Sequence, residues 1–138
     1  MPENPPASVW PILHYRDTTG ALHLLVDVLG FRAALVVRDD RGDIVHAELR
    51  WPEGGAVVFG SAAHTESAVH GGVQPGAGAS YVVTDDVDAV HERAERAGVE
   101  VVEPPNETRF GSGVATRACS LRDAEGNVWT FGTYRGAS

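Results

Sequence analysis

The apolar and polar positions of this 138-residue chain follow the same order in its two halves. Short runs rich in β-branched and aromatic residues are typical of strands, and apolar residues spaced by three and four positions lie on one face of a helix. The first half predicts a strand over 9–15, a helix with the apolar stripe Leu22, Leu25, Val26 and Leu29, and strands over 31–37, 44–51 and 56–59. Its elements therefore have the order βαβββ.

The second half predicts the same order of elements. Its strands are expected over 81–83, 99–102, 113–121 and 127–133, and its helix runs from Asp85 or Asp86 to Ala97. A carboxylate in this position can accept from the exposed N–H groups of the first turn, as Asp17 can in the first half. Gly30 and Gly98 are placed to end the two helices in a left-handed conformation.

Residue identities indicate that the two halves arose from one duplicated unit. Six residues recur 72 positions later: Leu49, Arg50, Glu53, Gly54, Phe59 and Gly60 as Leu121, Arg122, Glu125, Gly126, Phe131 and Gly132. Asp17 and Gly30 recur 68 positions later as Asp85 and Gly98. A four-residue insertion, which we place in a Pro-rich loop over 103–106, reconciles the two offsets. The sequence thus predicts an α+β fold of two tandem βαβββ modules.

The composition of the connecting segments predicts where the modules begin and end. Residues 1–8 are Pro-rich and form a flexible arm in this interpretation, followed by a single domain over 9–138. Within it, one module covers about 9–60, a linker rich in Gly, Ala and Ser covers 61–78, and the second module covers about 79–134. Segments of that composition are typical of linkers and surface loops.

Charge and hydropathy exclude several classes of partner. The net charge of −8 disfavours binding to a phosphate backbone, so we expect no nucleic-acid partner. The chain has no run of 18 apolar residues, so we expect no membrane partner.

The N-terminus does not resemble a signal peptide, and the single cysteine, Cys119, fits a reducing compartment. Cys119 is expected to be a small core residue, and the protein is expected to be cytoplasmic.

Four motifs carry a resemblance to a known family. They are Tyr15-Arg16-Asp17, Val28-Leu29-Gly30-Phe31, Thr84-Asp85-Asp86-Val87-Asp88 and Leu121-Arg122-Asp123-Ala124-Glu125-Gly126-Asn127-Val128-Trp129. With them the chain resembles the vicinal oxygen chelate superfamily, which includes glyoxalase I, extradiol dioxygenases and bleomycin-resistance proteins, and it is closest in character to the metal-free drug-binding members. The resemblance implies a curved sheet of eight strands around a cavity, with helices outside, in a homodimer that can exchange modules.

The same resemblance locates the positions where the enzymes of the superfamily hold a divalent metal ion. These positions correspond here to Trp10, Val58, Ala79 (or Ser80) and Thr130. They do not form a competent ligand set, because a catalytic metal needs about three protein ligands with nitrogen, sulfur or carboxylate donors. We therefore expect no metal and no other cofactor.

Two histidines on predicted strands leave an acid–base role or a relocated metal site open. His46 and Glu48 share one face of their strand because they are two residues apart, and His14 lies on the first strand. Histidine and glutamate can be tuned to titrate near neutral pH. The alternative is that His14 and His46 are polar residues of the cavity wall and that Glu48 pairs with an arginine.

The remaining cavity residues predict an aromatic or apolar ligand. The predicted ligand-binding residues are Trp10, Ile12, His14, His46, Glu48, Trp51, Val58, Tyr81, Val83, Phe110 and Thr130, of which Trp51 and Phe110 would close the rim. A tryptophan in place of a metal ligand is suited to stacking on a flat group, although Trp10 can also be plain core. Trp129 and Phe131 are expected to face the helices.

These observations favour metal-independent binding and sequestration of a bulky, partly aromatic natural product, which would confer antibiotic resistance or self-protection. One alternative is a lyase or isomerase of glyoxalase type that uses a displaced metal or His/Glu acid–base chemistry. Another is a sensor of a small metabolite or an accessory subunit. A homodimer is expected because the first helix carries a second apolar stripe of Ala21, Leu24 and Val28, and because sheet edges need a partner.

Overall fold

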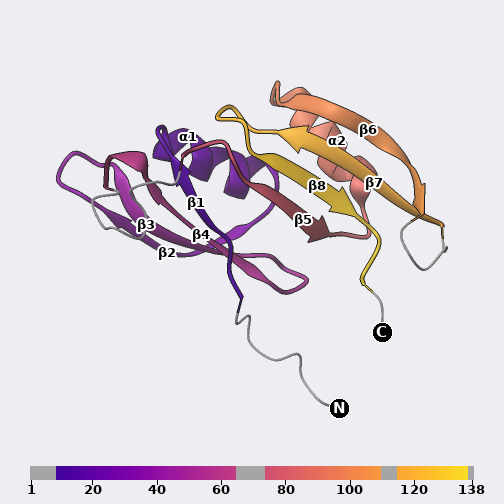
Figure 1. Cartoon of the computed structure of the whole chain (residues 1–138), viewed down its shortest axis with the longest axis horizontal. Helices are drawn as coiled ribbons and strands as arrows, with labels where there is room; N and C mark the ends of the chain where they lie inside the picture. Colours follow the sequence, from indigo (N-terminus) through magenta and orange to yellow (C-terminus); the bar gives the residue numbers. More distant parts are fainter. Residues whose placement is uncertain (1–8, 65–73, 110–114, 137–138) are drawn as a thin grey trace, which may run out of the picture. The chain divides into compact units, whose positions relative to one another are not determined.

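The chain divides into two compact units, each built around one four-stranded sheet (Figure 1). The structure, a computed structural model, describes residues 9–64, 74–109 and 115–136. The units are Met1–Gly76 and Ala77–Ser138. Phe110, one of the predicted rim residues, lies outside the described residues.

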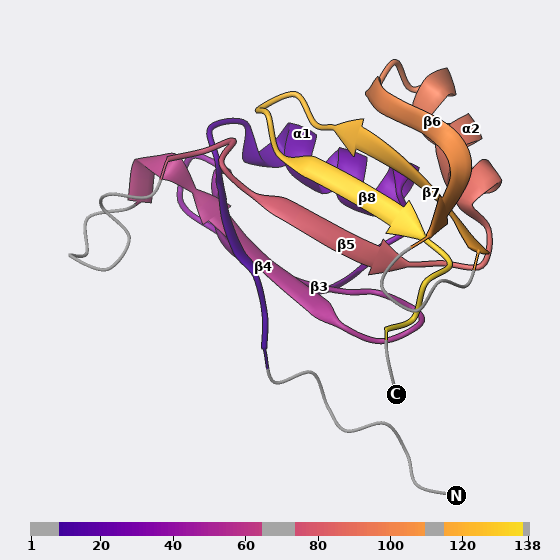
Figure 2. The ribbon, with the colours of Figure 1, turned by 45° about the vertical axis from the view of Figure 1, so that its right-hand side comes forward.

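The first unit has the predicted βαβββ order. Its elements are β1 (Ile12–Tyr15), α1 (Thr18–Leu22), the π-helix η1 (His23–Val28), β2 (Arg32–Arg38), β3 (Ile44–Arg50), β4 (Ala56–Ser61) and the 3₁₀ turn η2 (Ala62–His64). The strand order is β1-β4-β3-β2. Strand β1 runs parallel to β4, beside which it lies in Figure 2, and the other pairs are antiparallel.

The second unit repeats this arrangement. Its elements are β5 (Ala79–Val83), α2 (Val87–Arg96), β6 (Glu100–Arg109), β7 (Ala115–Arg122) and β8 (Val128–Gly132). The strand order is β5-β8-β7-β6, and α2 lies against one face of this sheet (Figures 1 and 2). The α+β class and the two tandem βαβββ modules are therefore confirmed, with the eight expected strands divided between two sheets of four.

The local signals that predicted the helices act as expected. The carboxylate of Asp17 accepts from the N–H of Gly20 at 2.9 Å, and that of Asp86 accepts from the N–H of Ala89 at 3.2 Å. Asp86, and not Asp85, is thus the cap of α2. Gly30 and Gly98 follow the helices with φ of 102° and 77°, a region in which a side chain would be strained.

The first helix differs from the predicted α-helix because its second half is π-helical. The N–H of Leu29 donates to the carbonyl of Leu24, five residues earlier, at 2.9 Å. The buried residues include Ala21 and Val28 besides Leu25. Of the second apolar stripe, which motivated the prediction of a dimer, Ala21 and Val28 are thus buried within the single chain and Leu24 is partly buried. This stripe therefore gives little support to a dimer.

The Pro-rich segment was expected to form a loop, and this was wrong because it lies inside β6. The pairing of β6 with β7 shifts between Val101 and Glu103 and again between Glu103 and Asn106. The first shift repeats the one between Ala33 and Leu35 in the pairing of β2 with β3. Strand β6 is at the edge of its sheet, where bulges tolerate proline.

Each sheet has one buried face, which the strand register identifies. The buried residues on this face include Leu13, Tyr15, Ala47, Leu49, Val57 and Phe59 in the first sheet and Val82, Cys119, Leu121, Trp129 and Phe131 in the second. The rings of Tyr15 and Phe59 meet edge to face with centroids 5.4 Å apart. Burial raises the pKa of the Cys119 thiol to about 11. The expected core roles of Cys119, Trp129 and Phe131 are confirmed.

Candidate ligand-binding faces

Six of the predicted ligand-binding residues belong to the first unit and share the face of its sheet opposite the core. Register places Ile12, Val58 and Glu48 in one row across β1, β4 and β3, and Leu35 of β2 completes that row. His14 lies opposite Gly60, and His46 lies opposite Val37. We call these residues, together with Trp10, Arg32, Arg50 and Ala56, the first open face.

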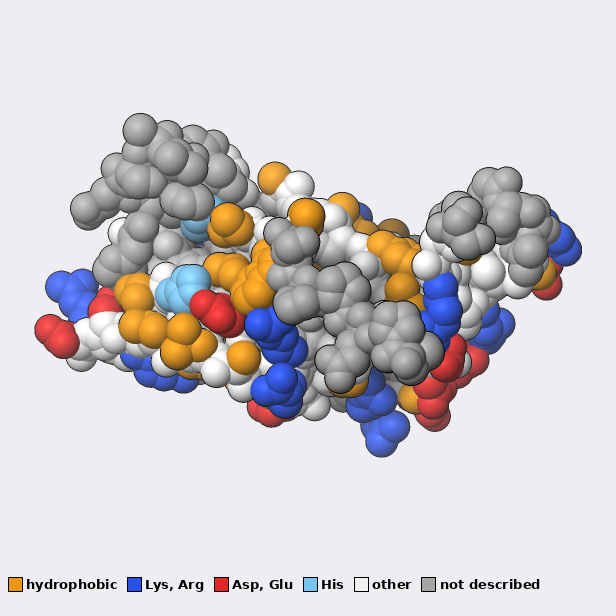
Figure 3. Space-filling model, turned by 90° about the horizontal axis from the view of Figure 1, so that it is seen from below, with side chains coloured by type: hydrophobic (Ala, Val, Ile, Leu, Met, Phe, Trp, Pro, Cys, Tyr) orange, Lys and Arg blue, Asp and Glu red, His pale blue; other side chains and the backbone are white. Residues whose placement is uncertain are grey.

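Large apolar side chains are exposed on the first open face. The exposed fractions are 52% for Ile12, 44% for Leu35 and 41% for Val37. The face seen in Figure 3 shows hydrophobic side chains beside a histidine and a carboxylate, with arginine side chains next to them. Apolar surface gathered in this way is typical of binding sites.

A hydrogen bond joins the two polar residues in the middle of the first open face. The Nε2 atom of His46 lies 2.8 Å from the Oε2 atom of Glu48, and both side chains are partly exposed. The expectation that Glu48 pairs with an arginine was wrong, since among the described residues its partner is His46. A histidine held by a carboxylate is an arrangement used in general acid–base catalysis, because the carboxylate can orient the imidazole ring.

The three residues considered for a relocated metal site do not form one. Within the described residues no group of three or more His, Cys, Asp or Glu side chains is arranged to hold a metal ion. His14 lies on β1 and is buried, whereas His46 and Glu48 lie on β3, with β4 between these strands. The positions that the family resemblance assigns to the metal do not fit it either, because Trp10, Val58 and Ala79 offer no ligand atom.

Trp10 lies at the end of the first open face, just before β1. The guanidinium carbon of Arg50 is 4.7 Å from the centroid of the Trp10 ring, which is a cation–π contact. Trp10 is only partly buried. It is therefore a residue of the open face and not part of the core.

Trp51 occupies a different place from the rim position predicted for it. Its ring contacts Phe31, with centroids 4.9 Å apart, and Phe31 is buried. Trp51 follows Arg50 at the end of β3, so its side chain points away from the first open face. It is thus not grouped with the other predicted residues.

The second unit presents a corresponding face that includes Tyr81, Val83 and Thr130. The hydroxyl of Tyr81 donates to the carbonyl of Tyr134 at 2.8 Å, and partial burial raises the pKa of Tyr81. The hydroxyl oxygens of Thr130 and Ser120 are 2.7 Å apart. Tyr81 is 41% exposed and therefore available for stacking.

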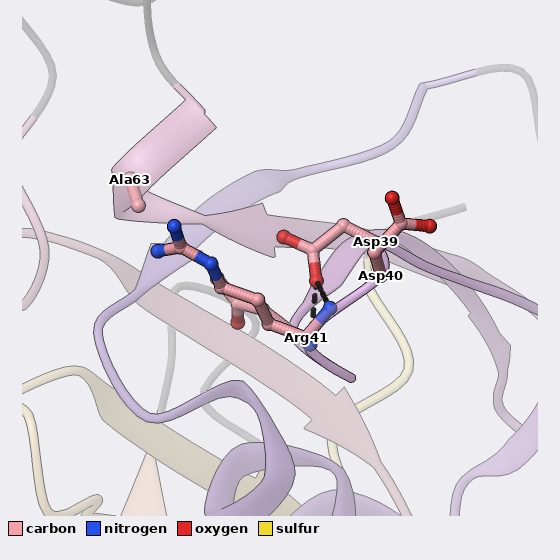
Figure 4. A pocket seen from close by; sticks show the side chains of 5 residues that line it. Asp39, Asp40, Arg41 and Ala63 are labelled. Atoms are coloured by element: carbon pink, nitrogen blue, oxygen red, sulfur yellow. Dashed lines mark hydrogen bonds between the residues drawn. The ribbon is translucent and has the colours of Figure 1, made fainter.

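A pocket of about 430 Å³ lies in the first unit at the turn between β2 and β3 and had not been predicted (Figure 4). It is lined by Asp39, Asp40, Arg41, Asp43 and Ala63. The carboxylate of Asp39 accepts from the backbone N–H groups of Arg41 and Asp43 at 2.9 and 3.0 Å. This acid thus shapes the turn, and the pocket contains no residue of the predicted site.

Sequence reasoning missed Arg32, Arg50, Leu35 and Val37 on the first open face. Arg50 could have been found, because it lies two and four residues after Glu48 and His46 on the same strand. Leu35 and Val37 lie on this face only because a register shift in β2 moves them there. Hydrophobic alternation alone does not reveal such a shift.

Two βαβββ modules, each with one covered and one open sheet face, define a class of small α+β proteins that bind or transform small molecules. Residues 11–131 match the family described as the Glyoxalase/Bleomycin resistance protein/Dioxygenase superfamily. The chain belongs to this superfamily. None of the helices in the described part of the chain is long and apolar enough to cross a membrane.

Several solved structures are similar to most of the chain. TioX from Micromonospora sp. ML1 is 29% identical, with a TM-score of 0.69 over 91% of this chain and 98% of TioX. A glyoxalase/bleomycin resistance protein from Streptomyces sp. CB03234 is 21% identical, with a TM-score of 0.64 over 89% and 98% of the two chains. Lactoylglutathione lyase from Agrobacterium tumefaciens is 20% identical, with a TM-score of 0.63 over 93% and 94%. Among curated proteins no sequence matches.

Proposed function

We propose that this protein binds and sequesters a bulky, partly aromatic natural product without a metal ion, and so protects a cell against an antibiotic. The observation that carries the proposal is the first open face, where exposed Ile12, Leu35 and Val37 lie on the same sheet surface as Trp10. A flat apolar ligand would remove this surface from water, which favours binding. Tyr81 gives the open face of the second unit an exposed aromatic ring of its own.

The residue types at the family's metal positions support metal independence. The positions that the family resemblance gives to metal ligands hold Trp10, Val58, Ala79 and Thr130. The first three have no atom that binds a divalent ion, and the Thr130 hydroxyl is hydrogen bonded to Ser120. The chain thus retains the fold of its superfamily while the position of one ligand carries an aromatic ring.

Tryptophan fluorescence tests this proposal. The protein would be titrated with a panel of flat aromatic antibiotics, and the same sample would be assayed for bound metal. Saturable quenching without stoichiometric metal is expected, and Trp10→Ala should weaken it. Trp51→Phe is the matched control, because Trp51 packs against Phe31 away from the open face. The proposal fails if no member of the panel quenches, or if Trp51→Phe weakens binding as much as Trp10→Ala.

The second candidate function is a lyase or isomerase of glyoxalase type, and the 2.8 Å contact between His46 and Glu48 favours it. In this case Glu48 would orient His46, which would take and return a proton of the substrate. Turnover of a glutathione hemithioacetal, lost in both His46→Gln and Glu48→Gln but kept in His23→Gln, would support the enzyme. His23 is a suitable control because it also contacts a carboxylate, that of Asp27 at 2.9 Å, but on the first helix. Absence of turnover in the native protein would remove this candidate.

We further propose that the protein is a cytoplasmic homodimer, with or without exchanged modules. The outer strand β2 supports this proposal, because most of its residues are exposed and its outer edge has no neighbouring strand in the sheet. Analytical ultracentrifugation would test it. A monomer at all concentrations would exclude the dimer without affecting the proposed binding function.

A further inference from the structure

Two arginines face each other on the first open face. Arg32 of β2 lies directly opposite Arg50 of β3 in the antiparallel register. Like charges in such a cross-strand pair repel each other and destabilise a sheet. Among the described residues neither guanidinium has a carboxylate partner, and Glu48, which shares the face, is bonded to His46. In the described part of this unit no carboxylate therefore neutralises the repulsion between the two guanidinium groups.

The duplicated module shows how the same position can be neutralised. Arg122 is the counterpart of Arg50, and its cross-strand neighbour is Glu100, 68 residues after Arg32. The Nη1 atom of Arg122 donates to the Oε2 atom of Glu100 at 2.8 Å. The same cross-strand position therefore holds an ion pair in the second unit and two cations in the first.

Trp10 fixes the orientation of one of these cations. With its guanidinium carbon 4.7 Å from the ring centroid, Arg50 lies over the face of Trp10. A guanidinium stacked on a ring keeps its N–H groups free at its edge, where they can bind the two oxygens of an acidic group. Ile12 and Leu35, in the neighbouring row, supply apolar surface beside it.

We propose that Arg32 and Arg50 bind an anionic group, such as a carboxylate, sulfate or phosphate, carried by a ligand whose aromatic part lies on the first open face. This inference rests on the proposed binding function and adds that the ligand is an acid. The overall charge of −8 repels anions, so the attraction has to come from this pair itself. The Arg122–Glu100 pair, being internally neutralised, takes no part.

The first experiment tests the anion site alone. The chain has eleven arginines and no lysine, so NMR of the arginine ¹⁵Nε–H groups can follow each guanidinium. The full chain would be titrated with sodium sulfate against sodium chloride at constant ionic strength. Saturable shifts at Arg32 and Arg50, lost in Arg50→Gln and kept in Arg122→Gln, are expected. Equal, unsaturated drift of all arginines would overturn the inference.

The second experiment asks whether the acid is joined to an aromatic ring. Binding of 2-naphthoate would be compared with that of 2-naphthamide, which has the same shape without the charge. We expect the naphthoate to bind about tenfold more tightly, since one charge-assisted hydrogen bond accounts for that difference. Arg50→Gln and Arg32→Gln should each reduce this preference, whereas Arg122→Gln should preserve it.

The two experiments separate this inference from the proposed function. Equal affinity for naphthoate and naphthamide, without a sulfate response, would overturn the anion site and leave sequestration of an aromatic ligand intact. A sulfate response without binding of either naphthalene would support the anion site and count against an aromatic ligand. If the protein binds sulfate and naphthoate with equal affinity, the ligand is a free anion. The proposal that the ligand is an aromatic acid would then be overturned.

Discussion

The indole Nε1 of Trp129 donates a hydrogen bond of 3.1 Å to the Oδ2 atom of Asp123. The same buried carboxylate accepts from the backbone N–H groups of Glu125 and Asn127 and from the side-chain amide of Asn127. It therefore ties the turn between β7 and β8 to the core residue that follows it. The corresponding turn of the first unit, from Trp51 to Gly55, has the same backbone hydrogen bonds, with Trp51 at the position of Asp123.

Loss of the Asp123 carboxylate should destabilise the second unit. Asp123→Ala leaves several buried donors without an acceptor, and we expect a cost of about 3 kcal/mol in the free energy of unfolding. Urea denaturation followed by Trp fluorescence would measure it. Asp40→Ala, at an exposed turn position, is the control and should change stability by less than about 0.5 kcal/mol. Equal effects of the two substitutions would contradict this role of Asp123.

The ion pair between Asp88 and Arg117 should make part of the protein's stability depend on pH in the acid range. Arg117 donates to both carboxylate oxygens of Asp88, at 2.9 and 2.7 Å, and holds the pKa of Asp88 below its ordinary value of 3.8. A carboxyl whose pKa is lowered by folding stabilises the protein above its unfolded-state pKa, and this contribution is lost as the pH falls through the folded-state value. As the pH is lowered below 3.8, the urea concentration at the midpoint of unfolding should therefore decrease less steeply for Asp88→Asn than for the native protein. Asp40→Asn, which removes an exposed carboxyl, is the control, and an equal change of slope in both variants would contradict the role of the ion pair.

Periodicity, caps and the repeat were sufficient to predict the modules, because each signal acts within a few residues of its element. Asp17 and Gly30, for example, begin and end the first helix without help from distant contacts. The features that the sequence did not predict depend on pairing between strands. Whether prolines lie in a loop or in a bulged edge strand, and whether Trp10 or Trp51 joins the open face, is decided by register and by ring contacts such as that with Phe31. The partner of Glu48, in contrast, was within reach of the sequence, because His46 is two residues away on the same face of its strand.

The thiol of Cys119 should be unreactive in the folded protein. Its side chain is fully buried in the second sheet, and burial raises its pKa to about 11, so it stays protonated at neutral pH. Because the thiolate is the reactive form, an aromatic disulfide reagent at pH 8 should react with Cys119 only after unfolding. The rate with and without 6 M urea would be compared. Rapid modification of the folded protein would show that this strand opens readily or that the thiol is accessible.

Gly132 should be required for the placement of Tyr81. A Cβ atom at this position would lie 2.5 Å from the Tyr81 hydroxyl oxygen and 2.9 Å from a ring carbon, so the ring would have to move. Gly132→Ala should then weaken the hydrogen bond from Tyr81 to the Tyr134 carbonyl and cost about 1–3 kcal/mol, as overpacking does elsewhere. The same substitution in a Tyr81→Ala background removes the clash, so its cost there should be smaller. A cost that is the same in both backgrounds would assign the effect to the backbone of β8 and not to Tyr81, and chemical shifts of the Tyr81 ring would distinguish the two cases directly.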